Sequence, residues 1–322
     1  MKLFDEIKPV FFIDNKMNNI LNDINVKLKK INVNDKQKRK YMISKSKIRS
    51  IHSSLAIEAN SLSLFDVEII SENKLILGKK DEVQEVKNAI EAYNHINEYN
   101  YKSENDLLKL HELMMKYFDE DNGNYRNHGE GVKRKDEIIY MAPESILVPS
   151  LMKSLFEYIS SSDLNIIILS AIFHYYFVFI HPFSDGNGRC ARFWVTLMLI
   201  NYDKNFEFIP LEEEIYLNQE NYYLAIAECH NNGNANVFIK FILQTINSSL
   251  DKLIKNSNFV CNDIQNKIIE LIANNNRITQ NEIANITNVN VRTIKRNFKI
   301  LIDNLIIERI GSDKAGYWQI LK

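Results

Sequence analysis

The residue types best suited to chemistry in this sequence are gathered in residues 181–192, which read HPFSDGNGRCAR. Gly186 and Gly188 flank an asparagine, and glycine lets the backbone adopt left-handed conformations and approach a ligand closely. If a helix begins near Gly188, its first N–H groups lack partners within the helix and form a site for anions. Phosphate is the natural occupant of such a site.

Charged and titratable side chains surround this expected anion site. Arg189 and Arg192 are three residues apart and share one face of a helix, which suits a ligand with several phosphates. Asp185 offers the hard oxygen that Mg²⁺ takes together with phosphate oxygens. Histidine has an ordinary pKa close to neutrality, so His181 is suited to accept a proton from a hydroxyl group. The set predicts transfer of a phosphorus-containing group.

Each of these residues also has an ordinary structural interpretation. A single histidine at a helix end is usually a cap or part of the core, and Gly-Asn-Gly is usually a turn. Paired arginines usually line a solvated face. The combination within residues 181–192 is what makes the pattern specific.

With all of these positions filled, 181–192 resembles the complete active-site motif of the Fic family, HPFxDGNGRxxR. The resemblance implies transfer of AMP from ATP to a hydroxyl side chain of a target protein. It implies that His181 is the general base and that Asp185 holds Mg²⁺. Arg192 would contact the terminal phosphate or an inhibitory glutamate. The implied phosphate ligands are Asn187, the backbone of Gly186 and Gly188, and Arg189.

Apolar segments on both sides of this motif are expected to hold it in place. Residues 164–180 are almost continuously apolar, and 193–200 are apolar again. The first segment is short for a membrane span, contains Asn165 and His174 and runs directly into a polar loop, so it reads as a buried helix. Nine Gly and five Pro in 322 residues favour a mainly helical protein.

Net charge, cysteine content and the first residues bear on the partners and the cellular compartment of the protein. Forty basic and 41 acidic residues give a formal net charge of −1, so no global charge indicates nucleic acid or a membrane surface as partner. Cys190, Cys229 and Cys261 lack metal-binding spacing and fit free thiols in a reducing compartment. The first residues lack the charged-then-apolar layout of a signal peptide. We therefore expect a cytoplasmic protein that does not associate with membranes.

A helical segment ending near residue 60 resembles the inhibitory motif of Fic proteins that carry their inhibitory helix before the catalytic domain. Ser54 and Glu58 match its SxxxE pattern, although Ala59 stands where Gly or Asn is more usual. The helix dipole disfavours a carboxylate at a helix C-terminus, so Glu58 needs a cationic partner. The resemblance implies that this partner is Arg192 and that Glu58 blocks productive placement of the ATP terminal phosphate.

Between the two motifs the sequence predicts a helix at 104–117, in which His111 reads as a structural histidine, and one small β-hairpin. Residues 132–134 and 137–141 read as strands around a turn at 135–136. By itself the hairpin is a connection between helices. In Fic proteins the equivalent flap holds the target segment as an added strand, so the resemblance implies that a target protein binds along 131–143.

Two tyrosines that follow the motif are candidates for contact with the nucleotide base. The run Glu220-Asn221-Tyr222-Tyr223 resembles a downstream Fic pattern whose tyrosines lie near the adenine. Aromatic rings serve base stacking and core packing alike, so Tyr222 and Tyr223 fit either role.

The last part of the chain resembles a winged helix-turn-helix domain. A polar stretch at 255–258 reads as a linker, and Thr279 and Glu282 form a capping box that begins the second of three short helices. Residues 306–310 and 317–320 read as a two-stranded wing. The third helix, 291–305, would enter a DNA major groove or dock on a protein. Its basic residues are Arg292, Lys295, Arg296 and Lys299.

These patterns predict a mainly α protein with a Fic helical-bundle core, a small β-hairpin flap and a C-terminal winged helix-turn-helix domain. The expected divisions are 1–100 for the N-terminal helical region with the inhibitory helix, 101–250 for the Fic catalytic core and 260–322 for the winged helix.

The leading hypothesis is a protein adenylyltransferase that uses ATP and Mg²⁺, modifies a Ser, Thr or Tyr hydroxyl, also modifies itself, and is restrained by Glu58. Three alternatives stay open: transfer of another phosphate-containing group, removal of AMP from a target, and a DNA-binding regulator that only senses nucleotide. The sequence also leaves open the identity of the target and the formation of a homo-oligomer.

Overall fold

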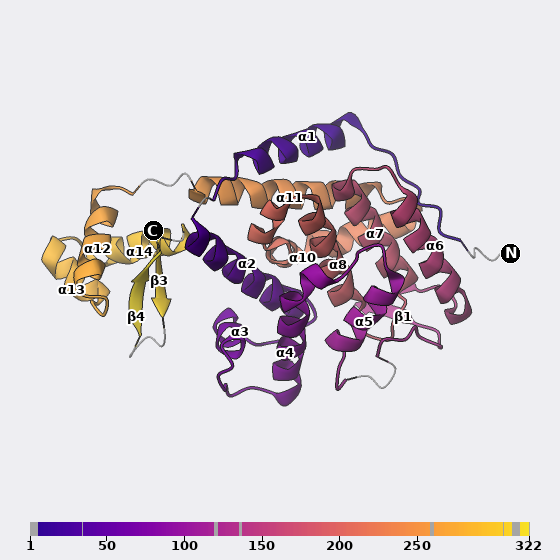
Figure 1. The fold of residues 1–322 in the computed structure, drawn as a ribbon, viewed down its shortest axis with the longest axis horizontal. Coiled ribbons are helices and arrows are strands. Elements are labelled where there is room, and N and C mark those ends of the chain that lie inside the picture. The colour runs from indigo at the N-terminus through magenta and orange to yellow at the C-terminus, as the bar shows by residue number, and fades with distance from the viewer. Residues whose placement is uncertain are drawn as a thin grey trace. The chain divides into compact units, whose positions relative to one another are not determined.

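The structure, a computed structural model, describes residues 6–33, 35–118, 122–134, 137–257, 261–304, 306–310 and 316–321. The chain divides into two compact units, one made of 1–29 and 42–250 and the other of 30–41 and 251–322. Helices make up most of the described chain (Figure 1), which confirms the predicted mainly α class. The finer division into 1–100, 101–250 and 260–322 stays a prediction.

Two buried helices occupy the interior of the first unit. They are α7 (Ile166–Ile180) and α8 (Asn187–Tyr202), and they pack along each other. Almost every residue of both helices is buried, because α7 and the part of α8 from 193 to 200 are largely apolar on all faces and neighbouring helices surround them. Asn165 begins α7 by accepting a hydrogen bond from the Ile167 N–H at 2.9 Å. The apolar segments predicted at 164–180 and 193–200 are therefore the buried helices expected.

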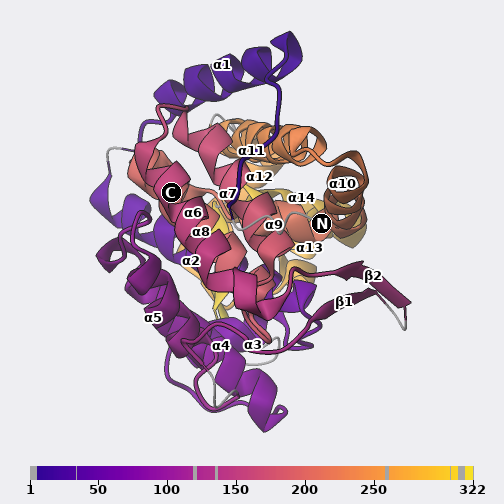
Figure 2. The ribbon, with the colours of Figure 1, turned by 90° about the vertical axis from the view of Figure 1, so that its right-hand side faces the viewer.

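The other helices of the first unit surround this pair (Figures 1 and 2), with α5 in contact with α8 and α6 in contact with α7. Short 3-10 turns at Ile96–Glu98, Ser145–Leu147 and Lys204–Phe208 connect some of them. The helices are α1 (Asn15–Lys30), α2 (Lys36–Ile57), α3 (Leu64–Ser71), α4 (Lys80–Asn94), α5 (Glu104–Met114), α6 (Val148–Ser161), α9 (Leu211–Leu217), α10 (Gln219–Asn232) and α11 (Asn236–Ser257).

The predicted hairpin is present as the antiparallel strands β1 (Gly131–Arg134) and β2 (Glu137–Met141). Gly131 pairs with Met141, and the register shifts after Val132. Figure 2 shows the hairpin extending away from the helices. The turn expected at 135–136 lies outside the described residues.

The second unit contains the expected winged helix elements. They are α12 (Asp263–Asn274), α13 (Gln280–Thr287), α14 (Val291–Asp303), β3 (Ile307–Ile310) and β4 (Tyr317–Ile320). The third helix thus ends at Asp303, and Leu305 lies outside the described residues, as does the turn of the wing at 311–315.

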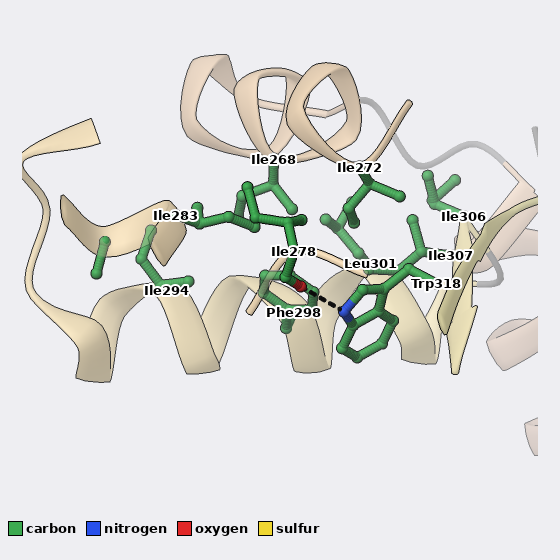
Figure 3. Close-up of a cluster of buried hydrophobic side chains, with 11 residues drawn as sticks. Ile268, Ile272, Ile278, Ile283, Ile294, Phe298, Leu301, Ile306, Ile307 and Trp318 are labelled. Carbon is green, nitrogen blue, oxygen red and sulfur yellow. Dashed lines mark hydrogen bonds between the residues drawn. The ribbon is translucent and has the colours of Figure 1, made fainter. Parts of the chain in front are cut away.

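Apolar side chains from all three helices and the wing form the core of this unit (Figure 3). Ile268, Phe298 and Trp318 are among its buried members, and the Trp318 indole Nε1–H donates to the Ile278 carbonyl at 3.2 Å. Thr279 begins α13 with the predicted capping box, in which Glu282 reaches back to the Thr279 N–H.

Candidate active site

Left-handed residues bound the loop between α7 and α8. His181 ends α7 with a φ of 51°, and its N–H donates to the Phe177 carbonyl at 2.9 Å. Gly186 precedes α8 with a φ of 79°. A side chain at Gly186 would also collide with Met115, so glycine is required there for two reasons. The loop 181–186 therefore reverses the chain between two rigid helices.

The side chain of Asn187 holds this loop closed. Its Oδ1 accepts from the Phe183 N–H at 3.0 Å, and its Nδ2 donates to the Phe183 carbonyl at 2.7 Å. Asn187 is only 3% exposed. The phosphate contact expected of this side chain stays a prediction, because each end of the amide makes one bond to the loop backbone and keeps one further hydrogen-bonding position.

His111 in α5 supports the other end of the loop. Its Nδ1 accepts from the Gly123 N–H at 2.9 Å, so its Nε2 carries the proton that is donated to the Asp185 carbonyl at 3.0 Å. Its ring stacks on Phe183 with centroids 3.6 Å apart. This buried histidine is structural, as its place within a helix predicted.

The His181 imidazole is partly buried at the C-terminal end of α7. Burial lowers the pKa of His181 below its ordinary value, although the Val178 carbonyl, 3.4 Å from Nδ1, opposes this shift. The imidazole is therefore neutral at pH 7 and able to accept a proton.

Asp185 and Arg189 form an ion pair at the start of α8. Arg189 Nη2 lies 2.7 Å from Asp185 Oδ2, and its Nη1 lies 3.2 Å from Glu85 Oε1 in α4. Burial raises the pKa of Asp185, but Arg189 outweighs burial and holds that pKa below its ordinary value. The Arg189 side chain is 4% exposed, whereas that of Asp185 is 66% exposed. Asp185 therefore presents an ionised, accessible carboxylate.

Arg192 is buried in α8 and bonded to the end of α2. Its Nε donates to Ser54 Oγ at 3.0 Å, and its Nη2 donates to the Ser54 carbonyl at 2.9 Å and to Glu58 Oε1 at 2.7 Å. Burial alone lowers the pKa of the guanidinium, but the Glu58 carboxylate outweighs burial and raises it. The structure thus brings Ser54, Glu58 and Arg192 together.

The Glu58 carboxylate also lies against the first turn of α8. A side chain at Gly188 would collide with Glu58 Oε1 and with the Arg192 guanidinium. Among the described residues no side chain caps the start of α8, so its first N–H groups face this region. A carboxylate of the chain itself therefore lies at the helix terminus that attracts anions.

The two tyrosines of α10 differ in exposure. Tyr222 is 2% exposed, and its hydroxyl lies 2.9 Å from Nε2 of the buried His174. Its ring packs beside Phe238 with centroids 5.9 Å apart. Burial argues against an adenine contact by Tyr222, and the contact remains a prediction for the partly exposed Tyr223.

Two residues of the site are absent from the sequence-based set. Glu85 pairs with Arg189 from α4, and Arg126, from the irregular segment between α5 and β1, donates from Nε to the His181 carbonyl at 2.7 Å. Glu85 lies in the run 82–88, which resembles the same Fic subgroup, but its pairing with Arg189 was not predicted, and Arg126 lies in no motif or periodic pattern that would single it out. Only the tertiary fold brings them to the loop.

Asp185 offers the kind of oxygen ligand that Mg²⁺ requires. Within the described part of the chain, no three His, Cys, Asp or Glu residues gather as a metal site. Mg²⁺ bound with a polyphosphate takes one or two carboxylates and completes its shell with phosphate oxygens and water. The exposed, ionised carboxylate of Asp185 beside an anion-binding helix start fits that requirement.

Comparison with known proteins defines the class. Residues 101–199 match the model of the Fic/DOC family. A Fic family protein from Desulfovibrio desulfuricans G20 has a TM-score of 0.75 and 29% identity, covering 98% of both chains. A Fic domain containing signaling protein from Bacteroides thetaiotaomicron VPI-5482 shares the fold, with a TM-score of 0.60 and 19% identity over 75% of this chain and 96% of that chain. The fold and the motif define a Fic domain.

The chain carries this Fic domain together with a C-terminal winged helix, as the sequence predicted. Residues 262–308 match the model described as winged helix-turn-helix DNA-binding. Curated relatives include Protein adenylyltransferase Fic of Nematostella vectensis, 27% identical over 223 residues that cover 66% of this chain and 50% of that protein. The protein of the same name from Drosophila yakuba is 26% identical over 213 residues, 62% of this chain and 40% of that protein.

The chain therefore spans about half the length of the curated relatives it matches, or less. Among the residues that the structure describes, no helix has both the length and the apolar character needed to cross a membrane.

Proposed function

We propose that this protein is an adenylyltransferase that transfers AMP from ATP to a hydroxyl side chain of a protein and that Glu58 restrains this activity. The observation that carries the proposal is the arrangement at the start of α8. A neutral histidine, an ionised carboxylate and two buried arginines surround a helix N-terminus. The name of the curated relatives supports AMP as the transferred group.

His181 acts as the general base in this proposal. Its neutral imidazole removes the proton of a Ser, Thr or Tyr hydroxyl, whose oxygen then attacks the α-phosphorus of ATP. The new bond joins that oxygen to phosphorus, and the bond from the α-phosphorus to the bridging oxygen breaks. Pyrophosphate leaves with the electron pair, and the proton stays on His181.

The start of α8 binds the phosphates. The N–H groups of its first turn and the Arg189 guanidinium stabilise negative charge that grows on the phosphate oxygens. Asp185 would hold Mg²⁺, which neutralises phosphate charge when it is bound. Strands β1 and β2 form a two-stranded sheet, so within the described part of the chain each strand has one edge without a neighbouring strand, where a target segment would add as a further strand.

Glu58 restrains the reaction by occupying part of the same site. Its carboxylate lies against Gly188 and holds the buried Arg192, so a terminal phosphate would have to displace a charge of the same sign. Ser54 strengthens the hold through its two hydrogen bonds from Arg192.

Self-modification with ATP labelled at either the α- or the γ-phosphate tests the proposal. Losing one charge-assisted hydrogen bond changes an equilibrium by about tenfold or more, so Glu58→Gly is expected to raise incorporation of the α-label by at least about tenfold. His181→Ala in that background is expected to abolish it. Incorporation of the γ-label instead indicates a phosphotransferase, and no gain in Glu58→Gly contradicts restraint by Glu58.

Glu213→Gln is the matched control for this experiment. Glu213 also pairs with a residue of α2, since its Oε2 lies 3.4 Å from Arg49 Nη1, but neither partner belongs to the motif. This variant is expected to retain the activity of the wild type. A gain as large as that of Glu58→Gly would mean that loosening α2 anywhere activates the protein.

A second function, binding of DNA by the winged helix, is favoured by the exposed face of α14. Arg292, Lys295, Arg296 and Lys299 are all exposed on this helix. The corresponding family model is described as DNA-binding. Such a face suits a helix that enters the major groove and contacts phosphates on its rim.

Salt-dependent binding of the wild type to mixed-sequence duplex DNA tests this function. Each phosphate contact contributes about 0.9 to the slope of log affinity against log salt, so Arg292→Gln with Arg296→Gln should reduce the slope by about 2. Lys267→Gln with Lys252→Gln lowers the charge equally outside α14 and is the control. An unchanged slope in the α14 variant contradicts DNA binding by this face.

A further inference from the structure

Arg126 makes an unusual set of contacts for a buried charge. It is 3% exposed, and its guanidinium donates to main-chain carbonyls from all three nitrogens. Nε donates to the His181 carbonyl at 2.7 Å and Nη1 to the His128 carbonyl at 2.7 Å. Nη2 donates to the Pro143 carbonyl at 2.6 Å and to the Ile180 carbonyl at 3.3 Å.

These carbonyls belong to two different parts of the site. Ile180 and His181 close α7, where carbonyl groups lack partners within the helix and the helix dipole favours a cation. His128 lies just before the hairpin, and Pro143 lies just after it. The Arg126 N–H adds a bond to the Pro182 carbonyl at 2.9 Å. One side chain thus joins the end of α7 to both ends of the hairpin.

The left-handed conformation of His181 explains why the bond from Arg126 to the His181 carbonyl matters. A residue other than glycine rarely adopts a left-handed conformation, and it persists there only when neighbouring groups hold it. The bond from Arg126 Nε to the His181 carbonyl fixes the peptide group that follows the imidazole-bearing residue. A planar guanidinium can hold four carbonyls at set angles, whereas a lysine ammonium cannot.

We propose that Arg126 is a positioning residue that holds the His181 imidazole and the β1–β2 hairpin in a fixed position relative to each other. A hydroxyl group of a target segment bound along the hairpin then reaches the imidazole. This proposal rests on the adenylyltransferase function proposed above. Arg126 acts through His181 and the hairpin and touches no phosphate site.

The charge of Arg126 has a second effect on the same imidazole. It opposes protonation of His181, together with burial, while Glu130 before the hairpin and Glu58 at the end of α2 favour protonation. Removing the Arg126 charge should therefore raise the pKa of His181, whereas Arg126→Lys keeps the charge and should leave that pKa close to its value in the protein with Arg126.

The test compares Arg126→Met and Arg126→Lys in the Glu58→Gly background. Both are expected to lower kcat for transfer of the α-label by at least about tenfold, because misplacement of a reacting group by about 1 Å has an effect of this size or larger. KM for ATP is expected to change less than about twofold, because Arg126 does not contact the phosphate site. Histidine NMR titration should show a raised His181 pKa in Arg126→Met alone, with the His181 signal identified by its loss in His181→Ala. Hydrogen exchange of the hairpin amides should be faster in both variants.

Tyr125→Phe is the matched control. It removes the bond from the Tyr125 hydroxyl to Glu104 Oε1, 2.7 Å long, in the neighbouring residue of the same segment, and leaves the contacts of Arg126 in place. This variant should keep the kcat and the hairpin exchange of its parent. An equal loss in Tyr125→Phe would mean that any loosening of the segment has the same effect, and would overturn the proposal.

Two further outcomes separate the role of Arg126 from the proposed enzymatic function. Folded Arg126→Met and Arg126→Lys proteins with unchanged kcat and hairpin exchange would contradict the positioning role. If the parent itself transfers no label, the proposed enzymatic function fails, whereas faster hairpin exchange and the shifted His181 pKa still support the role of Arg126.

Discussion

The side-chain amide of Asn187 spans the loop 181–186 and bonds both backbone groups of Phe183. Because these bonds are buried, Asn187→Ala leaves a donor and an acceptor unsatisfied, and we expect a loss of about 2 kcal/mol in the free energy of unfolding. We also expect transfer of the α-label to fall by at least about tenfold in the Glu58→Gly background, because the loop then no longer holds His181 and Asp185 in place. Urea unfolding and the labelling assay measure the two effects.

Asn201→Ala provides the comparison at the other end of α8. The Asn201 amide donates to the Leu197 carbonyl at 2.9 Å, within the helix and away from the loop. Its substitution should leave transfer unchanged. Equal losses in the two variants would show that α8 as a whole, rather than the loop, determines activity.

At the scale of single residues, the sequence was enough to select most residues of the candidate site but not to predict which hydrogen bonds they make. The types and spacing of 181–192 were sufficient to select His181, Asp185 and the arginines, because each has a distinctive chemistry. The engagement of Asn187 with Phe183 depends on loop geometry, which the residue types do not encode. Arg126 could not be selected, because a single arginine in an irregular segment resembles any surface charge until the fold buries it.

At the scale of elements, the apolar pattern was the reliable signal. Helices α7 and α8 are buried on nearly all faces, which agrees with the apolar runs at 164–180 and 193–200, and Asn165, His181 and Gly186 lie at the helix ends. The capping box at Thr279 likewise placed the start of α13 correctly. The pairing of Glu58 with Arg192, by contrast, followed from family resemblance, because no local pattern relates residues 134 positions apart.

Across the first unit, a buried histidine couples stability to pH. Burial, aided by the nearby Arg192, lowers the pKa of His174 to about 3. Below pH 6.5 the unfolded chain takes up a proton at this position that the folded protein does not. Stability should therefore fall as the pH drops from 6.5 towards 3, by about 1.4 kcal/mol per pH unit from this residue.

Urea unfolding at pH 7, 6, 5 and 4 measures this dependence. His174→Gln keeps a polar group for the Tyr222 hydroxyl but cannot titrate, so its stability should fall less steeply below pH 6.5. His95→Gln removes an exposed histidine whose Nδ1 lies 2.8 Å from Glu98 Oε1, and should retain the acid sensitivity of the wild type. The same pH dependence in all three proteins would contradict a buried neutral His174.

The backbone conformation of the residue that follows Glu58 bears on the restraint proposed above. Ala59 adopts a φ of 68°, a left-handed conformation that costs an alanine about 1 kcal/mol and a glycine almost nothing. Any state in which the end of α2 unwinds and residue 59 returns to ordinary backbone recovers that energy. Relative to a glycine at this position, the methyl group of Ala59 thus enlarges the population of unwound molecules by about fivefold. In the restraint proposed for Glu58, the residue at position 59 thereby influences how often the end of α2 releases Arg192.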